Sequence, residues 1–172
     1  MSHYGEQPPQ MLELPGDDSR VMGCYWKPNP AFLDELAAYL KGKRVLEIFA
    51  GNGYLAACLT ARGVDIVSTT EFSGHDAHRS GIYHPVLEMS ARDAVLKYRS
   101  ESDTLLLSWP TVTIEAFCAA ILWGSSKPIA YIGEYTDYSK NQLGGCATDE
   151  FFELLEFKSK FSAYQGSCWE AA

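Results

Sequence analysis

The stretch "KRVLEIFAGNGYLAACLTARG" (residues 43–63) decides the fold. Residues 44–50 form a short, largely apolar run that is typical of a strand buried in a parallel sheet. The run stops at Gly51 and Gly53, and residues 53–63 continue with the spacing of a helix. This pattern predicts a strand that turns sharply into a helix, with backbone amides facing outward at the corner.

The rest of the chain continues this alternation. We predict helices over 29–42, 53–63, 90–98, 113–124 and 148–157, and strands over 44–50, 64–72, 85–89, 103–109 and 128–135, with one or two more within 160–170. Strands that alternate with helices imply crossover connections and a parallel sheet covered on both faces. The expected fold is therefore α/β, a three-layer, doubly wound, mostly parallel sheet that is short at its C-terminal strand pair. Ligands in such folds bind outside the carboxyl ends of the strands.

The chain of 172 residues is long enough for one domain with a substantial core. Residues 1–23 are rich in proline, glycine and charge without a sustained period, so we expect a flexible or loosely docked arm. Residues 24–172 are expected to form the single domain. The five cysteines include no CxxC pair, which argues against a disulfide framework or a metal site and favours the reducing cytoplasm.

Charge and hydropathy restrict the partners. The formal charge is −8, and nucleic-acid binding usually rests on a basic surface, so the balance argues against a nucleic-acid partner. No stretch approaches the roughly 20 apolar residues that a membrane-spanning helix needs. An acidic, compact chain with no evident substrate domain favours a small molecule or a protein side chain as the molecule acted on, and a protein partner or a homodimer stays open.

Two acids flank the glycine corner. Residues 51–56 fit the loose dinucleotide pattern G-x-G-x-x-G/A, and Glu71 follows at the end of the next strand, where an acid can bind ribose hydroxyls. The alternative is a plain turn followed by a solvated strand end. Glu47 interrupts the apolar strand itself, and a buried acid is costly unless it is paired or used.

These residues carry a resemblance to a known family. "VLEIFAGNGYLAACLTARG" resembles motif I of the class I S-adenosylmethionine-dependent methyltransferases, and the order of elements extends this resemblance over most of residues 29–137. It implies S-adenosyl-L-methionine as cofactor, with Glu47 and the glycines beside its methionine part, Glu71 at the ribose and Phe72 beside the adenine. The implied cofactor-binding residues are Glu47, Phe49, Gly51, Asn52, Gly53, Glu71, Phe72 and Asp93.

Phe49 departs from the common family pattern, which has glycine there. "FAGNG" instead resembles a variant found in methyltransferases that modify amino groups of DNA bases. Those enzymes also carry a [D/N/S]-P-P-aromatic tetrad after the fourth strand. In "SWPT" (residues 108–111), Ser108 and Pro110 match this tetrad, whereas Trp109 and Thr111 do not.

Asp93 follows the third predicted strand, where the family often contacts the adenine amino group. Ser90 and Asp93 also fit a helix capping box, and both interpretations can hold together. The candidate residues on the acceptor side follow the fourth and fifth strands. They are Ser108, Trp109, Tyr135 and Asp137. The alternatives are core packing for Trp109 and a surface position for the last two.

The loop over residues 73–85 contains His75, Asp76, His78 and His84. No spacing among them matches an established metal motif, so we predict no metal site and expect a solvated loop or a cofactor lid. The function that the sequence predicts is S-adenosylmethionine-dependent methyl transfer to a small molecule or a protein side chain. The alternatives are a catalytically weak or inactive binding module of the same fold, a nucleobase amino-methyltransferase and an NAD-dependent oxidoreductase.

Overall fold

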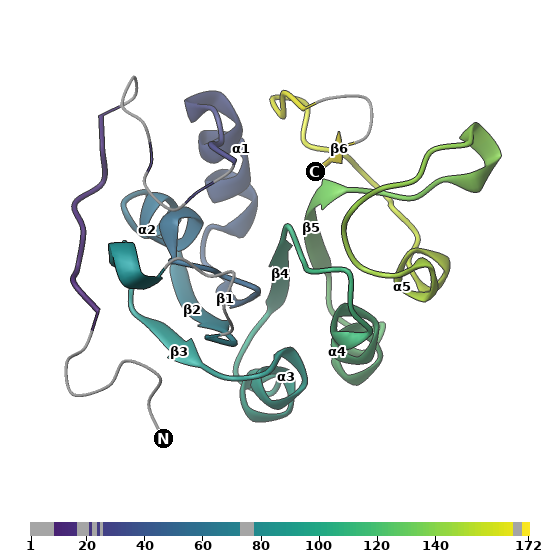
Figure 1. The fold of residues 1–172 in the computed structure, drawn as a ribbon, viewed down its shortest axis with the longest axis horizontal. Helices are drawn as coiled ribbons and strands as arrows, with labels where there is room; N and C mark the ends of the chain where they lie inside the picture. The colour runs from purple at the N-terminus through teal and green to yellow at the C-terminus, as the bar shows by residue number, and fades with distance from the viewer. Residues whose placement is uncertain (1–8, 17–20, 22–23, 25, 73–77, 167–169) are drawn as a thin grey trace.

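A computed structural model of the chain describes residues 9–16, 21, 24, 26–72, 78–166 and 170–172. Strands and helices alternate along most of its length (Figure 1). The elements are α1 (Pro30–Leu40), β1 (Arg44–Ile48), α2 (Tyr54–Thr60), β2 (Asp65–Thr70), η1 (His78–Ser80), β3 (Val86–Glu88), α3 (Ala91–Tyr98), β4 (Thr104–Ser108), α4 (Glu115–Trp123), β5 (Ile129–Glu134), η2 (Tyr138–Lys140), α5 (Asp149–Leu154) and β6 (Glu170–Ala171).

These strands form one six-stranded sheet in the order β3-β2-β1-β4-β5-β6. The first five strands are parallel, and β6 runs antiparallel to β5. The predicted α/β class and mostly parallel sheet are confirmed. The strand order changes direction between β1 and β4, and at such a point the connections leave toward opposite faces and open a crevice at the carboxyl edge.

Side chains that alternate along the strands build two cores. In β4, Leu106 packs with residues of α1 and α2, whereas Leu105 and Leu107 pack with residues of α3 and α4. Figure 1 shows the same division, with α1 and α2 on one face of the sheet and α3, α4 and α5 on the other. Burial on both faces explains the continuous apolar runs in the sequence.

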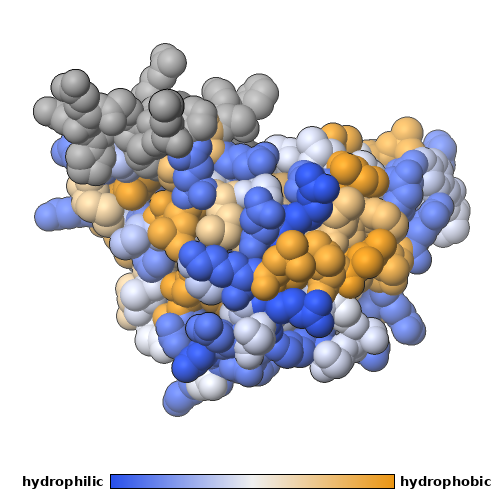
Figure 2. Space-filling view, turned by 90° about the horizontal axis from the view of Figure 1, so that it is seen from below, coloured by the Kyte–Doolittle hydropathy of each residue, from blue (hydrophilic) through white to orange (hydrophobic). Residues whose placement is uncertain are grey.

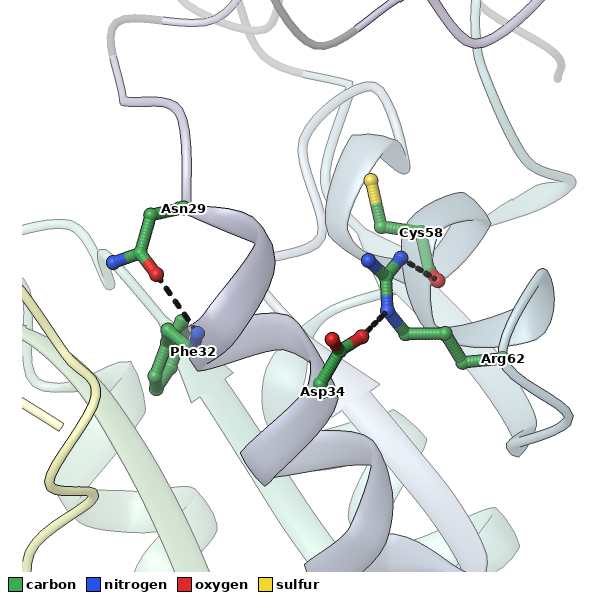
Figure 3. Close-up of polar contacts among 5 residues, drawn as sticks. All are labelled: Asn29, Phe32, Asp34, Cys58 and Arg62. Atoms are coloured by element: carbon green, nitrogen blue, oxygen red, sulfur yellow. Dashed lines mark hydrogen bonds and ion pairs between the residues drawn. The ribbon is translucent and has the colours of Figure 1, made fainter.

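Figure 3 shows the polar contacts at the start of α1 and the ion pair there that joins α1 to the segment after α2. The Asn29 side chain caps α1 by accepting a hydrogen bond from the Phe32 N–H at 2.8 Å. Arg62 reaches from the end of α2 to Asp34 at 2.7 Å and donates to the Cys58 carbonyl at 3.1 Å. Because the Asp34 side chain is 71% exposed, this ion pair contributes little to stability.

Helix α4 is apolar around most of its circumference. Ala116, Ala119 and Ala120 are buried against the sheet, yet Ile121 on the outer side is 53% exposed. Figure 2 views the molecule from the side of α3 and α4 and shows hydrophobic residues gathered on this face. The apolar and polar sides that mark an ordinary surface helix are therefore not separated in α4.

The two ends of the chain contain little regular structure in the described ranges, and the C-terminal end differs from the sequence expectation. Within the described part of the N-terminal arm, Leu12 donates to the Ile82 carbonyl and Ile82 donates to the Gln10 carbonyl, both at 2.8 Å. Helix α5 stops at Leu154 because Leu155 is extended, whereas a helix to residue 157 was expected. Of the strands expected within 160–170, the described residues contain only the two-residue β6, which begins at Glu170. No helix in the described ranges is long and apolar enough to cross a membrane.

Candidate functional site

A cavity of about 680 Å³ opens at the carboxyl edge of the sheet, beside the change in strand order. Its walls come from the segments that follow β1, β2, β3 and β4 and from the end of β5. The volume falls in the range of pockets for small ligands and cofactors. The wall residues that carry the chemistry are Phe49, Glu71, Met89, Trp109, Glu115 and Glu134.

Phe49 and Trp109 form the part of the wall that follows the two central strands. Each comes directly after its strand, and each has a left-handed backbone, with φ of 61° and 50°. Residues other than glycine adopt this backbone conformation at a cost of about 1–2 kcal/mol. Aromatic side chains thus line the cavity at two positions where glycine would be the unstrained choice.

The glycine corner itself faces the protein and does not line the cavity. The His78 ring is hydrogen-bonded to the Gly51 carbonyl at 2.8 Å, and the Tyr83 N–H donates to the Asn52 carbonyl at 2.8 Å. A Cβ atom on Gly53 would lie 2.9 Å from His84 Cβ. The described part of the histidine loop therefore covers the corner, while His75 and Asp76 lie outside the described residues.

Two backbone amides at the corner also donate hydrogen bonds within the turn. The Gly53 N–H donates to the Ala50 carbonyl at 2.9 Å, and the Tyr54 N–H donates to the Asn52 side chain at 3.3 Å. These bonds fix the turn from β1 into α2. Gly51, Asn52 and Gly53 were predicted to bind cofactor, and the structure gives them a role in this turn, away from the cavity.

Glu47 is fully buried in β1, on the face of the sheet that α1 and α2 cover. Its Oε2 accepts a hydrogen bond from Ser68 Oγ at 2.8 Å, and its Oε1 has no partner among the described residues. Burial raises the pKa of Glu47 to about 7, and the Ser68 bond offsets only part of this rise. Glu47 is thus a largely protonated core residue below pH 7, and it does not reach the cavity.

Only some of the residues expected near a nucleoside line the cavity. Glu71 follows β2, is exposed and lines the cavity. The Phe72 ring packs edge-on against the His78 ring, with ring centroids 4.5 Å apart, and Phe72 is not part of the cavity wall. Asp93 is exposed on α3, where its N–H donates to the Ser90 side chain at 3.1 Å, so the predicted cap at Ser90 is confirmed and Asp93 lies outside the cavity.

Only one of the residues expected on the acceptor side lines the cavity. Trp109 lines the cavity, whereas Ser108 and Tyr135 do not. The carboxylate of Asp137 accepts hydrogen bonds from Lys140 Nζ at 2.7 Å and from the Ser139 N–H at 3.0 Å. These bonds lower the pKa of Asp137 to about 2, so it is ionised at neutral pH and holds its loop together.

Several wall residues were missed by sequence reasoning. Glu134 ends β5 and accepts a hydrogen bond from the Gly145 N–H at 2.6 Å, and Glu115 pairs with Arg92 at 3.1 Å. The rule that selected Glu71, an acid at a strand end, would also have selected Glu134. Cys146 reaches the wall only because its loop folds back onto β5, which no local pattern indicates.

The cavity combines aromatic and carboxylate walls, and no lysine or arginine among the described residues lines it. This surface favours a ligand with a flat apolar part and with hydroxyl groups or positive charge. Within the described ranges, no group of three metal-ligating side chains occurs. The chain matches no protein-family model, no curated protein and no solved structure.

Proposed function

We propose that the chain is an S-adenosylmethionine-dependent methyltransferase and that the cavity at the carboxyl edge holds the cofactor. The position of Glu71 carries this proposal. It is the acid that directly follows β2 and it lines the cavity beside the change in strand order. A carboxylate at this place can accept hydrogen bonds from the paired hydroxyls of a ribose.

The wall suits the nucleoside part of the cofactor. Phe49 and Met89 offer apolar surface to a planar base, close to the acid that would bind the ribose. The carboxylates of Glu71 and Glu134 would favour the positive sulfonium by Coulomb attraction. The carboxylate of the amino-acid part meets no basic side chain among the described wall residues and is left to solvent or backbone groups.

The finer fold assignment belongs to the same proposal. The order β3-β2-β1-β4-β5 with an antiparallel strand beside β5 is compatible with the methyltransferase arrangement that the motif resemblance implies. The bound cofactor would supply an electrophilic methyl group. The residues of the chain would orient the partners and exclude water, and Trp109 and Pro110, which line the wall, would take part in this.

A binding module without strong catalysis is the second candidate, and one observation favours it. Of the four residues expected on the acceptor side, only Trp109 lines the cavity. The carboxylate of Asp137 is held by Lys140 and Ser139, which leaves it a poor proton acceptor. On this alternative the chain binds the nucleoside and acts through a protein partner.

Calorimetric titration separates these candidates. Saturable binding of S-adenosylmethionine together with methyl transfer to a small-molecule or protein acceptor supports the enzyme. Binding without product across broad acceptor panels supports the module. Binding of NADH in place of S-adenosylmethionine favours an oxidoreductase, and no binding at millimolar S-adenosylmethionine overturns the proposal.

A further inference from the structure

A second hollow, away from the cavity, lies along the outer edge of β5. We name it the edge groove; it has a volume of about 570 Å³. Residues 129–131 of β5 form its floor, residues 124–128 and 154–161 form its walls, and Ala172 closes one end. The groove shares no described wall residue with the cavity, so its occupant is independent of the proposed function.

The floor presents backbone groups that have no described strand opposite them. The Leu105 N–H donates to the Pro128 carbonyl at 3.2 Å, and the Trp109 N–H donates to the Ile132 carbonyl at 2.7 Å. The backbone groups of Pro128, just before β5, and of Ile132 therefore face β4. Backbone groups of successive residues in a strand point to opposite sides, so the N–H and C=O groups of Ile129 and Tyr131 point away from β4 and toward the groove. Among the described residues, β6 pairs only with Gly133 and Glu134.

The far wall is a segment that crosses outside this edge. Phe157 packs near Tyr131, with ring centroids 5.9 Å apart, and Phe161 packs against Phe32 of α1 at 5.8 Å. The segment thus passes from the face of α5 to the face of α1. No backbone hydrogen bond joins residues 156–160 to another described part of the chain. The groove therefore lies between the outer edge of β5 and residues 156–160, and no described backbone hydrogen bond joins these two segments.

The charge of the groove differs from that of the whole protein. Its walls contain Lys127, Lys158 and Lys160 against a single described acid, Glu156, while the chain carries −8 overall. The Lys127 ammonium donates to the carbonyls of Arg99 and Ser102, which leaves Lys158 and Lys160 to meet an occupant. An occupant with acidic side chains is therefore favoured. Pairing of two β5 edges from two copies would bring these lysines together, and like charges across a strand pair are destabilising.

We propose that the edge groove binds an extended, acidic peptide segment of a partner protein, which adds a strand to β5. An antiparallel strand in line with β6 would follow Ala172 and place three residues opposite Tyr131, Ala130 and Ile129, over about 10 Å at 3.3 Å per residue. Backbone hydrogen bonds to Ile129 and Tyr131 would give affinity, and the lysines would select acidic side chains.

The test uses the full chain and a fluorescein-labelled peptide of eight residues, alternating valine and threonine with two glutamates. Fluorescence anisotropy is expected to saturate on titration with the protein. Ile129→Pro removes an N–H that faces the groove and spares the bonds to β4, so peptide affinity is expected to fall at least ten-fold. Ile129→Val keeps the N–H and is expected to bind as the wild type does. Thermal melting verifies that both variants are folded.

Charge reversal tests the choice of occupant. The double variant Lys158→Glu/Lys160→Glu is expected to bind the acidic peptide at least ten-fold more weakly and a lysine-substituted peptide more tightly. Absence of saturable binding by the wild type at about 1 mM protein overturns the proposal. Equal affinity of Ile129→Pro and the wild type also overturns it. A wild-type dimer that Ile129→Pro dissociates in sedimentation assigns the groove to a second copy and overturns the partner peptide.

Discussion

Phe49 and Trp109 lie at the carboxyl ends of neighbouring parallel strands: each directly follows its strand, each has a left-handed backbone, and both line the same cavity. Strain of this kind persists only where surrounding packing fixes it, and it concentrates at functional sites. The pair thus marks the point between β1 and β4 where the strand order changes. It also places aromatic surface where a nucleoside would lie.

Substitution of Phe49 measures this strain. Phe49→Ala and Phe49→Gly remove nearly the same contacts, but only glycine adopts φ of 61° without cost. We expect Phe49→Gly to have a free energy of unfolding about 1 kcal/mol higher than that of Phe49→Ala, as measured by urea denaturation. The same pair at Leu96, which is exposed in helix α3, should show the opposite order, because alanine favours helix over glycine. An alanine preference at both sites would contradict the strained conformation.

Gly53 tests whether the histidine loop covers the glycine corner. Gly42 and Gly53 have similar φ values, 74° and 76°, but a Cβ atom meets nothing within 4 Å at Gly42. At Gly53 it would come within 3.0 Å of the His84 backbone carbonyl. We expect Gly42→Ala to cost about 1 kcal/mol of stability and Gly53→Ala about 3 kcal/mol. Equal shifts of the melting temperature would indicate that residues 84–86 do not pack on the corner.

Glu47 makes stability depend on pH. Its pKa is about 7 in the folded protein, against an ordinary value of 4.5, so the folded state holds a proton that the unfolded chain has released between these values. The stabilisation is complete below about pH 4.5 and is lost as the pH rises through about 7. The total loss is about 3 kcal/mol, from about 1.4 kcal/mol for each unit of pKa.

Glu47→Gln isolates this effect, because glutamine accepts the Ser68 hydrogen bond without titrating. We expect the free energy of unfolding of the wild type to fall more steeply than that of Glu47→Gln between pH 5 and pH 8. Urea denaturation at several pH values measures both slopes. Parallel curves for the two proteins would show that Glu47 does not take up a proton on folding.

Much of the fold is predictable because its signals are local. The strands at 44–50, 64–72, 103–109 and 128–135 were expected from apolar runs, and the structure has β1, β2, β4 and β5 within these ranges. A strand buried on both faces needs such a run whatever surrounds it. The end of α5 at Leu154 was not predictable, because the segment beyond it is held extended by distant aromatic rings such as Tyr131.

The candidate site was predictable only in part. The place of Glu71 results from its position alone, because acids after β2 must lie at the carboxyl edge. The glycine corner is covered by the histidine loop through contacts such as the hydrogen bond between His78 and the Gly51 carbonyl, which join residues far apart in sequence. Asp137 is similar: its type and position fit a proton acceptor, but a turn with Lys140 holds its carboxylate. Patterns along the chain thus locate the edge of the sheet, while packing decides which side chains reach the cavity.

The proposed binding of S-adenosylmethionine by Glu71 in this cavity is tested by calorimetric titration of this cofactor into two variants. Asp93→Ala serves as the matched control, because it removes an exposed carboxylate of the same region that does not line the cavity. We predict that Glu71→Ala weakens binding ten-fold or more, while Asp93→Ala binds as the wild type does. Unchanged affinity in Glu71→Ala would remove Glu71 from the cofactor site and contradict the proposed function.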